Sequence, residues 1–254
     1  MVMAIAQAKM NQKEMLGMSF QSSERGLNQD SVASAIVTER LRHDIIMGVF
    51  QPAQRLRLAE LKARYDIGSS PIREALSCLA AQQMVVQEPN RGFAVPDIST
   101  IELDDITNLR GQLESSAVAQ SVRHGDETWE ERLILSRRRL KRLGPAEDVI
   151  SETSSAESVQ QWEKHHREFH RALIGACPSE WTRRFCDTLN DQFDRYRRLS
   201  PPARDVQAGL DKQHDALLEV ALDRDAKTCK TLMADHIRIT GVAVMTGLKS
   251  KLGA

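Results

Sequence analysis

Three of the chain's seven histidines lie on apolar helical faces, where an ionisable ring is unusual. His170, His214 and His236 each share a face with leucines or isoleucines at helical spacing. His166 precedes His170 by one helical turn, the spacing that places two imidazoles on one ion. Because buried ring nitrogens need partners, the set predicts a divalent metal site. The alternative is that each ring is a core histidine bonded to a backbone or carboxylate group.

An arginine on another apolar face is a candidate clamp for an anion. Arg110 falls among leucine and isoleucine positions, and Glu114 follows one turn later. An inward guanidinium binds a carboxylate through two parallel hydrogen bonds, although a purely structural Arg110–Glu114 pair is the alternative. The later run Arg195-Tyr196-Arg197-Arg198 adds cations and a hydroxyl on a further helix. We expect Arg195 or Tyr196 to face the same pocket, and most of the run to lie on a solvated face.

Two short helices joined by a tight turn are predicted between residues 56 and 79. Apolar residues recur at helical spacing on both sides of a break, in which Gly68 permits a turn and Ser70 is placed to cap a helix starting at Pro71. The outward positions near the start of the second helix carry hydroxyls and a cation, which suit phosphates and base edges in a major groove. The pattern predicts a helix-turn-helix; the alternative is a helical hairpin that only packs into a core. Arg55, Arg57, Lys62, Arg64, Arg73 and Arg91 concentrate positive charge in this third of the chain.

A short β-hairpin is predicted directly after these helices. Two apolar segments, 84–87 and 93–95, flank a turn at 88–92 that carries the cation Arg91. A helix-turn-helix followed by such a hairpin is a winged helix. The residues predicted to contact DNA are Arg57, Ser69, Ser70, Arg73, Ser77 and Arg91.

These segments resemble, in order, the winged-helix domain of the GntR family of bacterial transcription regulators. The resemblance is carried by Gly48-Val49-Phe50-Gln51-Pro52, Arg55-Leu56, Ser70-Pro71-Ile72-Arg73-Glu74-Ala75-Leu76 and Arg91-Gly92-Phe93-Ala94-Val95. It implies that Arg73 contacts operator DNA, with Ser69 and Ser70 beside it and Arg91 at the wing. Where the family usually has a base-reading arginine, this chain has Ser69. Operator sequences of other members therefore do not transfer to it.

Length and composition bound the remaining possibilities. A chain of 254 residues is long enough for two domains, and 41% hydrophobic with 4% aromatic residues suits helical packing. The formal net charge of zero argues against a protein that coats nucleic acid through a global positive field. No apolar run is long enough to span a membrane and no secretory signal is evident, so a cytoplasmic protein is expected. The four cysteines lack C-x-x-C spacing and are expected to be reduced thiols.

The chain is expected to be mainly α-helical, with three parts. Residues 1–30 form a polar tail without periodicity, residues 31–96 form the winged helix, and residues 101–248 form an all-α effector and dimerisation domain. Val32, Ile36, Val37, Leu41 and Ile45 trace one face of the first helix. Six further helices are expected in an antiparallel bundle, at 101–123, 127–142, 155–176, 179–199, 204–222 and 225–248.

The second domain is similar to the FCD effector domain of the FadR branch of GntR regulators. His166-Arg167-Glu168-Phe169-His170 resembles that domain's D-x-x-F-H segment, and the likeness covers about residues 101–245. It implies metal ligands at His166, His170, His214 and His236, with His166 in place of the usual Asp. A fourth imidazole favours zinc or nickel over harder ions. The H-x-x-F-H segment and the R-Y-R run are most similar to CsiR-type regulators, which implies a dicarboxylate effector such as glutarate.

These observations together predict a ligand-responsive regulator that represses transcription as a homodimer on a palindromic operator. A small carboxylate bound at the metal-containing pocket is expected to release it from DNA. One alternative is a metal sensor in which the ion itself is the effector. Another is a metalloenzyme, which is disfavoured because no carboxylate is evidently placed as a general base.

Overall fold

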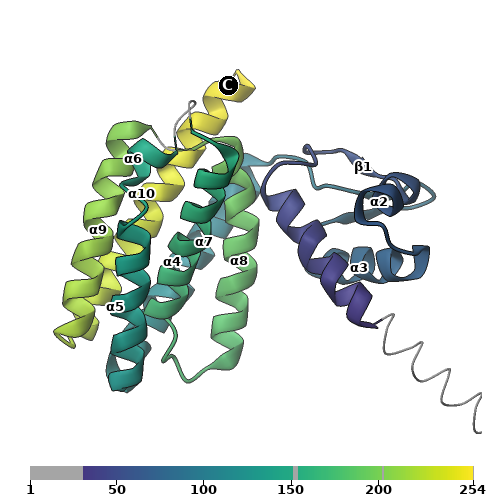
Figure 1. The fold of residues 1–254 in the computed structure, drawn as a ribbon. Helices are drawn as coiled ribbons and strands as arrows, with labels where there is room; N and C mark the ends of the chain where they lie inside the picture. Colours follow the sequence, from purple (N-terminus) through teal and green to yellow (C-terminus); the bar gives the residue numbers. More distant parts are fainter. Residues whose placement is uncertain (1–30, 151–153, 202, 254) are drawn as a thin grey trace, which may run out of the picture. The chain divides into compact units, whose positions relative to one another are not determined.

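The structure is a computed structural model that describes residues 31–150, 154–201 and 203–253 (Figure 1). The tail predicted over residues 1–30 lies outside the described residues. The chain divides into two compact units between Asp97 and Ile98.

The first unit contains the predicted helix-turn-helix. A helix over residues 31–46 precedes α2 (Leu58–Tyr65) and α3 (Ser69–Ala81). Their inward faces meet in one apolar core, whose most enclosed members are Leu41, Leu61, Ile72, Leu76 and Leu79. The apolar face predicted for the first helix is not buried in the N-terminal part of that helix. Val32 and Ile36 are 54% and 53% exposed, so only the later part of that face is buried.

The turn between α2 and α3 differs from the prediction. The helix begins at Ser69 with Gly68 as its N-cap, so Ser70 lies inside the helix and its Oγ is 3.5 Å from Glu74 Oε1. Pro71 fits because the first amides of a helix have no intrahelical acceptor to lose. Left-handed backbone occurs at Asp66, with φ of 53°, and not at Gly68, with φ of −64°. The prediction that Ser70 caps the helix was therefore wrong.

A three-stranded antiparallel sheet completes the first unit. Its strands are β1 (Arg55–Leu56), β2 (Val86–Glu88) and β3 (Gly92–Ala94), with β3 in the centre. Phe93 pairs with Gln87 on one side and with Leu56 on the other. The β2–β3 hairpin is the predicted wing, whereas the two-residue strand β1 was not predicted.

The second unit is the predicted helical bundle (Figure 1). All six expected helices are present, and a short α6 was not predicted. Side chains of serine or aspartate cap five of the helices by accepting backbone N–H groups, as is typical of helix N-termini. The helices are α4 (Thr100–His124), α5 (Glu127–Lys141), α6 (Ala146–Val149), α7 (Ala156–Leu173), α8 (Glu180–Leu199), α9 (Arg204–Leu222) and α10 (Ala226–Leu252). The predicted fold class is confirmed.

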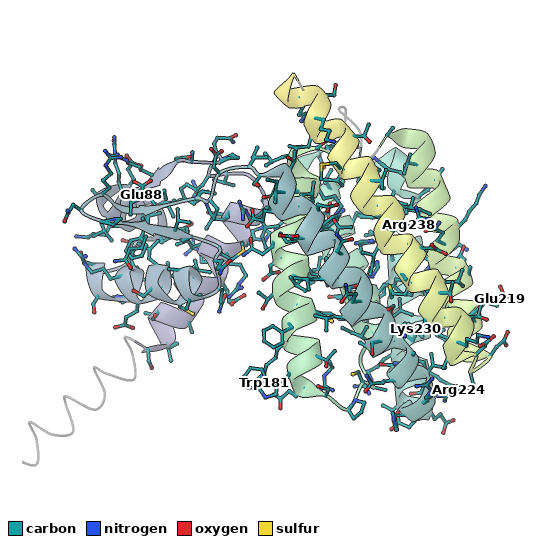
Figure 2. All side chains as sticks on the ribbon, turned by 180° about the vertical axis from the view of Figure 1, so that it is seen from behind. Glu88, Trp181, Glu219, Arg224, Lys230 and Arg238 are labelled. Carbon is teal, nitrogen blue, oxygen red and sulfur yellow. The ribbon has the colours of Figure 1, made fainter. Side chains whose placement is uncertain are left out.

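The long helices α4 and α10 form the most extensive helix pair of the bundle (Figure 2). They approach closely at Gly241, where an added Cβ would lie 2.2 Å from Thr107 Cγ2. Elsewhere α7 packs on α5 and α8 packs on α4. Trp129, Leu133 and Phe169 are among the enclosed side chains of the main core.

The cysteines are free thiols, as predicted: Cys78 is exposed, and Cys177, Cys186 and Cys229 are buried. Burial raises the pKa of both Cys186 and Cys229 to about 12, so these thiols stay protonated and unreactive. Among the described residues, no helix is long and apolar enough to span a bilayer.

Candidate functional site

The winged helix presents all of its predicted DNA-contacting side chains to solvent. On α3, Ile72 and Leu76 are fully buried while Arg73 lies on the opposite, exposed side. Arg57 is also exposed and is paired with Glu60 at 3.2 Å. The exposed set comprises Arg57, Ser69, Ser70, Arg73, Ser77 and Arg91. Because exposed cations and hydroxyls at the start of such a helix can reach phosphates and base edges, the surface has the chemistry of a DNA interface.

One ion pair anchors α2 to the helix before it. Asp44 accepts hydrogen bonds from Arg64 Nε at 2.8 Å and from the Tyr65 hydroxyl at 2.9 Å. Burial, followed by the hydrogen bond to Asp44, raises the pKa of Tyr65, so the hydroxyl remains a donor. Arg64 therefore supports the helix-turn-helix from within the unit, in contrast to exposed Arg73.

The structure brings the four predicted metal-site histidines together. His166 and His170 come from α7, His214 from α9 and His236 from α10. One ring nitrogen from each can be chosen so that all four lie within 4.8 Å of one another. We call these four residues the histidine cluster. Its members are buried except His166, which is partly exposed and stacks on Trp162 at a centroid distance of 4.7 Å.

The ring nitrogens of the histidine cluster are poorly satisfied by protein groups. In the described part of the chain, neither nitrogen of His170 or of His214 has a hydrogen-bond partner. Burial lowers the pKa of all four rings below the ordinary value, and neighbouring rings lower it further for His166, His170 and His236. The rings of the cluster are therefore neutral at pH 7, and one nitrogen from each lies within 4.8 Å of the others. Neutral imidazoles that lack partners are the donor set that a divalent transition metal requires.

A second layer of polar side chains surrounds the cluster. Gln213 Oε1 lies 3.0 Å from His236 Nδ1. Glu114 and Asp211 carboxylate oxygens lie 3.9 Å and 3.8 Å from the Nδ1 atoms of His170 and His214. Groups at this position orient metal-binding imidazoles and raise their basicity.

Arg110 lies next to the cluster and is held from two sides. Its Nε donates to Glu114 Oε1 at 2.8 Å, and its guanidinium lies over the Phe193 ring at 4.3 Å from the centroid. Asn190 Nδ2 also donates to Glu114 Oε1, at 3.1 Å. Burial raises the pKa of Glu114, while Arg110 opposes that shift. Both the predicted inward position of Arg110 and the predicted pair with Glu114 are present.

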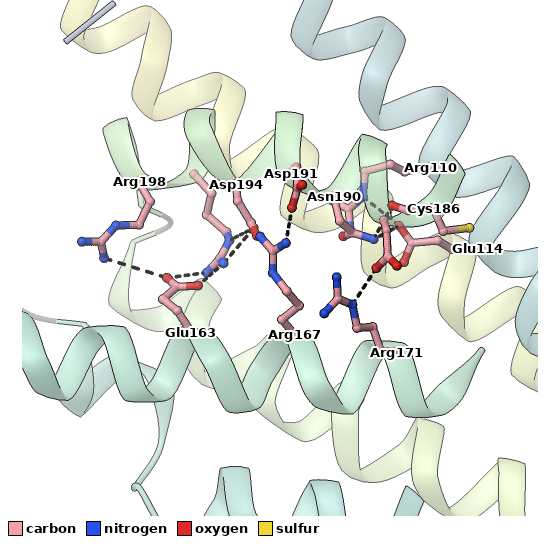
Figure 3. Close-up of polar contacts among 12 residues, drawn as sticks. Arg110, Glu114, Glu163, Arg167, Arg171, Cys186, Asn190, Asp191, Asp194 and Arg198 are labelled. Atoms are coloured by element: carbon pink, nitrogen blue, oxygen red, sulfur yellow. Dashed lines mark hydrogen bonds and ion pairs between the residues drawn. The ribbon is translucent and has the colours of Figure 1, made fainter. Parts of the chain in front are cut away.

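A network of ion pairs joins α7 to α8 beside the cluster (Figure 3). Arg167 on α7 binds both Asp191 and Asp194 on α8. Arg197 on α8 binds Asp194 and, in turn, Glu163 on α7. Arg171–Asp187 and Arg198–Glu163 complete what we call the α7–α8 ion network. Burial alone would raise the pKa of Asp194, but Arg197 and Arg167 outweigh it and hold the value at about 2.

The histidine cluster, Arg110 and part of the α7–α8 ion network line one cavity. The cavity has a volume of about 50 Å³. Arg167, Asp194 and Arg197 contribute charged side chains to its lining.

The structure corrects the expectation for the 195–198 run. Arg195 is bonded to Gln192 at 2.7 Å, and the Tyr196 hydroxyl is bonded to Glu102, so both lie outside the cavity lining. Arg197, which was expected on a solvated face, lines the cavity and is 7% exposed. The reason is helical geometry, since Arg197 follows Asp194 by three residues and Phe193 by four. Acidic and basic residues recurring at this spacing on α7 and α8 were the available signal.

Two family models match this chain in the order predicted. Residues 33–95 match the family described as bacterial regulatory proteins, gntR family, and residues 105–239 match the FCD domain. The chain belongs to the GntR family. It is thus a DNA-binding transcription regulator of the GntR type with an FCD domain, and the matching families and relatives are regulators and not enzymes.

Relatives and solved structures agree with this assignment. The chain is 40% identical over 203 residues to the HTH-type transcriptional regulator BphR of Paraburkholderia xenovorans, covering 78% of this chain and 80% of BphR. It is 32% identical over 201 residues to the HTH-type transcriptional repressor GlaR of Escherichia coli, covering 78% of this chain and 89% of GlaR. The structure of E. coli McbR/YncC superposes with a TM-score of 0.70 at 20% identity, over 84% of this chain and 97% of that one. At that identity the likeness concerns the fold.

Proposed function

We propose that this GntR regulator is a homodimeric repressor that leaves its operator when a small dicarboxylate binds at a divalent metal ion in the FCD domain. The observation that carries the proposal is the meeting of the histidine cluster with Arg110 in one buried cavity. A chain with a DNA-binding unit gains regulation when such a cavity responds to a ligand. The relative GlaR is named a repressor, which favours repression here.

The four histidines would hold the ion through one ring nitrogen each. One nitrogen from each ring lies within 4.8 Å of the others, as a shared ion requires, and among the described residues those of His170 and His214 have no hydrogen-bond partner. An all-imidazole set favours zinc or nickel. Bound there, the ion would supply a Lewis-acidic position for a carboxylate oxygen.

Arg110 would hold the same carboxylate from the other side. Its guanidinium is fixed by Glu114 and by the face of Phe193, so little side-chain entropy remains to be lost when an anion binds. An arginine fixed in this way provides parallel N–H donors for a carboxylate. We therefore propose that Arg110 and Arg197, which both line the cavity, contact the effector. The sequence had predicted Arg195 and Tyr196 in place of Arg197.

Operator binding would use the exposed surface of α3 and the wing. Arg73 is the proposed principal contact, supported by Ser69, Ser70 and Ser77 on α3 and by Arg57 and Arg91. One winged helix reads only a short half-site, so two copies related by a two-fold axis are needed for a palindromic operator. This requirement is the basis for proposing a homodimer.

The proposal is tested by operator release and thermal unfolding of the same preparations. Protein loaded with zinc, protein loaded with nickel and chelated protein are each titrated with succinate, glutarate and adipate. A ligand that binds only the folded chain raises the unfolding midpoint, and the proposed effector also lowers operator affinity. If the metal alone releases the operator and no acid does, the chain is a metal sensor. If neither the metal nor any acid changes the midpoint, the proposal is wrong.

A further inference from the structure

We infer that the α7–α8 ion network is the entrance of the effector cavity, and that the distal carboxylate of the effector takes the place of Asp194 between Arg167 and Arg197. The inference rests on the proposed function and names the class of ligand that the cavity takes. That class is a dicarboxylate whose two ends reach, respectively, the metal side and the α7–α8 side of the cavity.

Ion pairs made by long side chains connect α7 and α8, as they also connect α5 and α9 through Arg137. Helix α7 packs on α5, and α8 packs on α4. Between α7 and α8 the described contacts are ion pairs made by long side chains, which span the gap between the two ribbons (Figure 3). Ion pairs near water can be exchanged for pairs with another charged group at low net cost, whereas separating packed apolar surface loses its full burial. The solvated outer pair of this wall can be exchanged at low cost, so we place the entrance of the cavity there.

Exposure of the ion pairs gives the network an outer and an inner part. The outer pair Arg171–Asp187 has side chains that are 52% and 43% exposed. At the inner part, the side chains of Arg197 and Asp194 are 8% and 14% exposed, and both residues line the cavity. Arg167 lines it as well, with its side chain 24% exposed. An anion moving inward thus passes from solvated to buried guanidinium groups.

Asp194 occupies the position that a ligand carboxylate would need. It is bound by Arg167 and Arg197 at once, and each arginine also has another carboxylate, Asp191 or Glu163. When a ligand carboxylate displaces Asp194, each guanidinium therefore keeps its other carboxylate partner. Asp194 acts as an internal competitor for the ligand at this position.

The balance of charge favours a dianion. The network contains four guanidinium groups and four carboxylates and is neutral in itself. Imidazoles bind a metal ion in their neutral form, so a divalent ion held by the histidine cluster would bring two uncompensated positive charges into a buried site. A buried charge is costly unless it is paired. A dicarboxylate supplies the two negative charges that neutralise the ion.

Two substitutions with opposite expected effects test the inference. Asp194→Asn removes the internal competitor, so glutarate should bind the zinc-loaded protein about tenfold more tightly. Arg167→Gln removes one of the two cations, so glutarate should bind about tenfold more weakly. Valerate, which has the same chain length but one carboxylate, should bind both variants as it binds wild type. Calorimetric titration of the full chain measures all of these affinities.

Matched controls are available on α8. Arg184 and Glu180 form an exposed pair on the same helix, with both side chains 64% exposed. Glu180→Gln and Arg184→Gln make the same changes of charge away from the cavity and should alter glutarate affinity less than twofold. Zinc content and operator binding without effector should stay at wild-type levels in the two control variants.

The outcomes separate this inference from the proposed function. The inference is supported if the two substitutions shift glutarate affinity in opposite directions and leave valerate affinity unchanged. General damage to the fold would instead change glutarate affinity in the same direction in Asp194→Asn and Arg167→Gln. If wild type binds zinc and glutarate but both variants bind glutarate as wild type does, the inference is wrong and the proposed function stands. If wild type binds zinc but no carboxylate, the proposed effector is wrong.

Discussion

Replacing His214 by alanine should remove most of the metal affinity of the FCD domain. His214 is 2% exposed, and neither of its ring nitrogens has a hydrogen-bond partner among the described residues, although an Asp211 carboxylate oxygen lies 3.8 Å from Nδ1. A four-ligand zinc site contributes about 10–16 kcal/mol, which is about 2.5–4 kcal/mol for each ligand if they share it equally. Loss of one ligand therefore weakens zinc binding about 70- to 900-fold.

Stability should respond to the same substitution only when metal is present. Zinc at about one hundred times its dissociation constant stabilises the wild-type fold by about 2.7 kcal/mol. For a domain of this size that corresponds to a rise in the unfolding midpoint of about 5–10 °C. In chelator, His214→Ala should change the free energy of unfolding by no more than about 2 kcal/mol, since the cavity it leaves is offset by removal of two unpaired buried nitrogens.

Competition with a chromophoric chelator measures the zinc affinity, and thermal unfolding with and without chelator measures the stabilisation. His165→Ala is the matched control, because His165 is next to the cluster on α7 but its ring is bonded to Glu168 at 2.8 Å. The control should keep wild-type zinc content. Undiminished zinc affinity in His214→Ala, or an equal loss in His165→Ala, would refute the four-histidine site.

Three further outcomes are expected. Arg73→Ala should weaken operator binding at least about tenfold and flatten its salt dependence, measured by fluorescence anisotropy at several salt concentrations, with the fold unchanged; full retention would exclude Arg73 from the interface. Arg110→Gln should leave operator binding intact but weaken release by dicarboxylates, and an unchanged response would make Arg110 purely structural. In urea titrations the chelated protein should lose stability between pH 7.5 and pH 5.5, by up to about 1.4 kcal/mol per pH unit for each cluster ring that stays neutral. The sign follows because the folded rings have pKa values below 6.5, so in this range only the unfolded chain takes up protons, and a flat profile would contradict the lowered pKa values.

Apolar periodicity was sufficient to predict most of the helices and the convergence of the histidines. His170, His214 and His236 share helix faces with buried apolar residues, so their inward direction follows from their neighbours along the chain. Periodicity says nothing about elements that are too short to show a repeat. The strand β1 has two residues and exists through its pairing with β3, and α6 has four residues. Both depend on contacts that local sequence does not encode.

The remaining errors have physical causes as well. Ser70 has a side chain suited to capping, but the helix starts one residue before it, so the propensity of a residue did not decide the boundary. Arg197 was expected in solvent because buried arginines are rare without partners. Its partners Glu163 and Asp194 are 34 and 3 residues away, and only the nearer one is visible as a local pattern. Burial of charge depends on such distant pairing and is hard to predict from one sequence.

The division at Asp97 also bears on how such regulators diversify and how they can be re-engineered. Each apolar cluster in the described residues draws all of its members from one side of that boundary. Neither half needs the other to complete its core, so an exchange of genetic material at this point leaves both halves able to bury their own apolar surface. The same boundary is a suitable junction for chimeric biosensors, in which this effector half is joined to a DNA-binding half whose operator is already known.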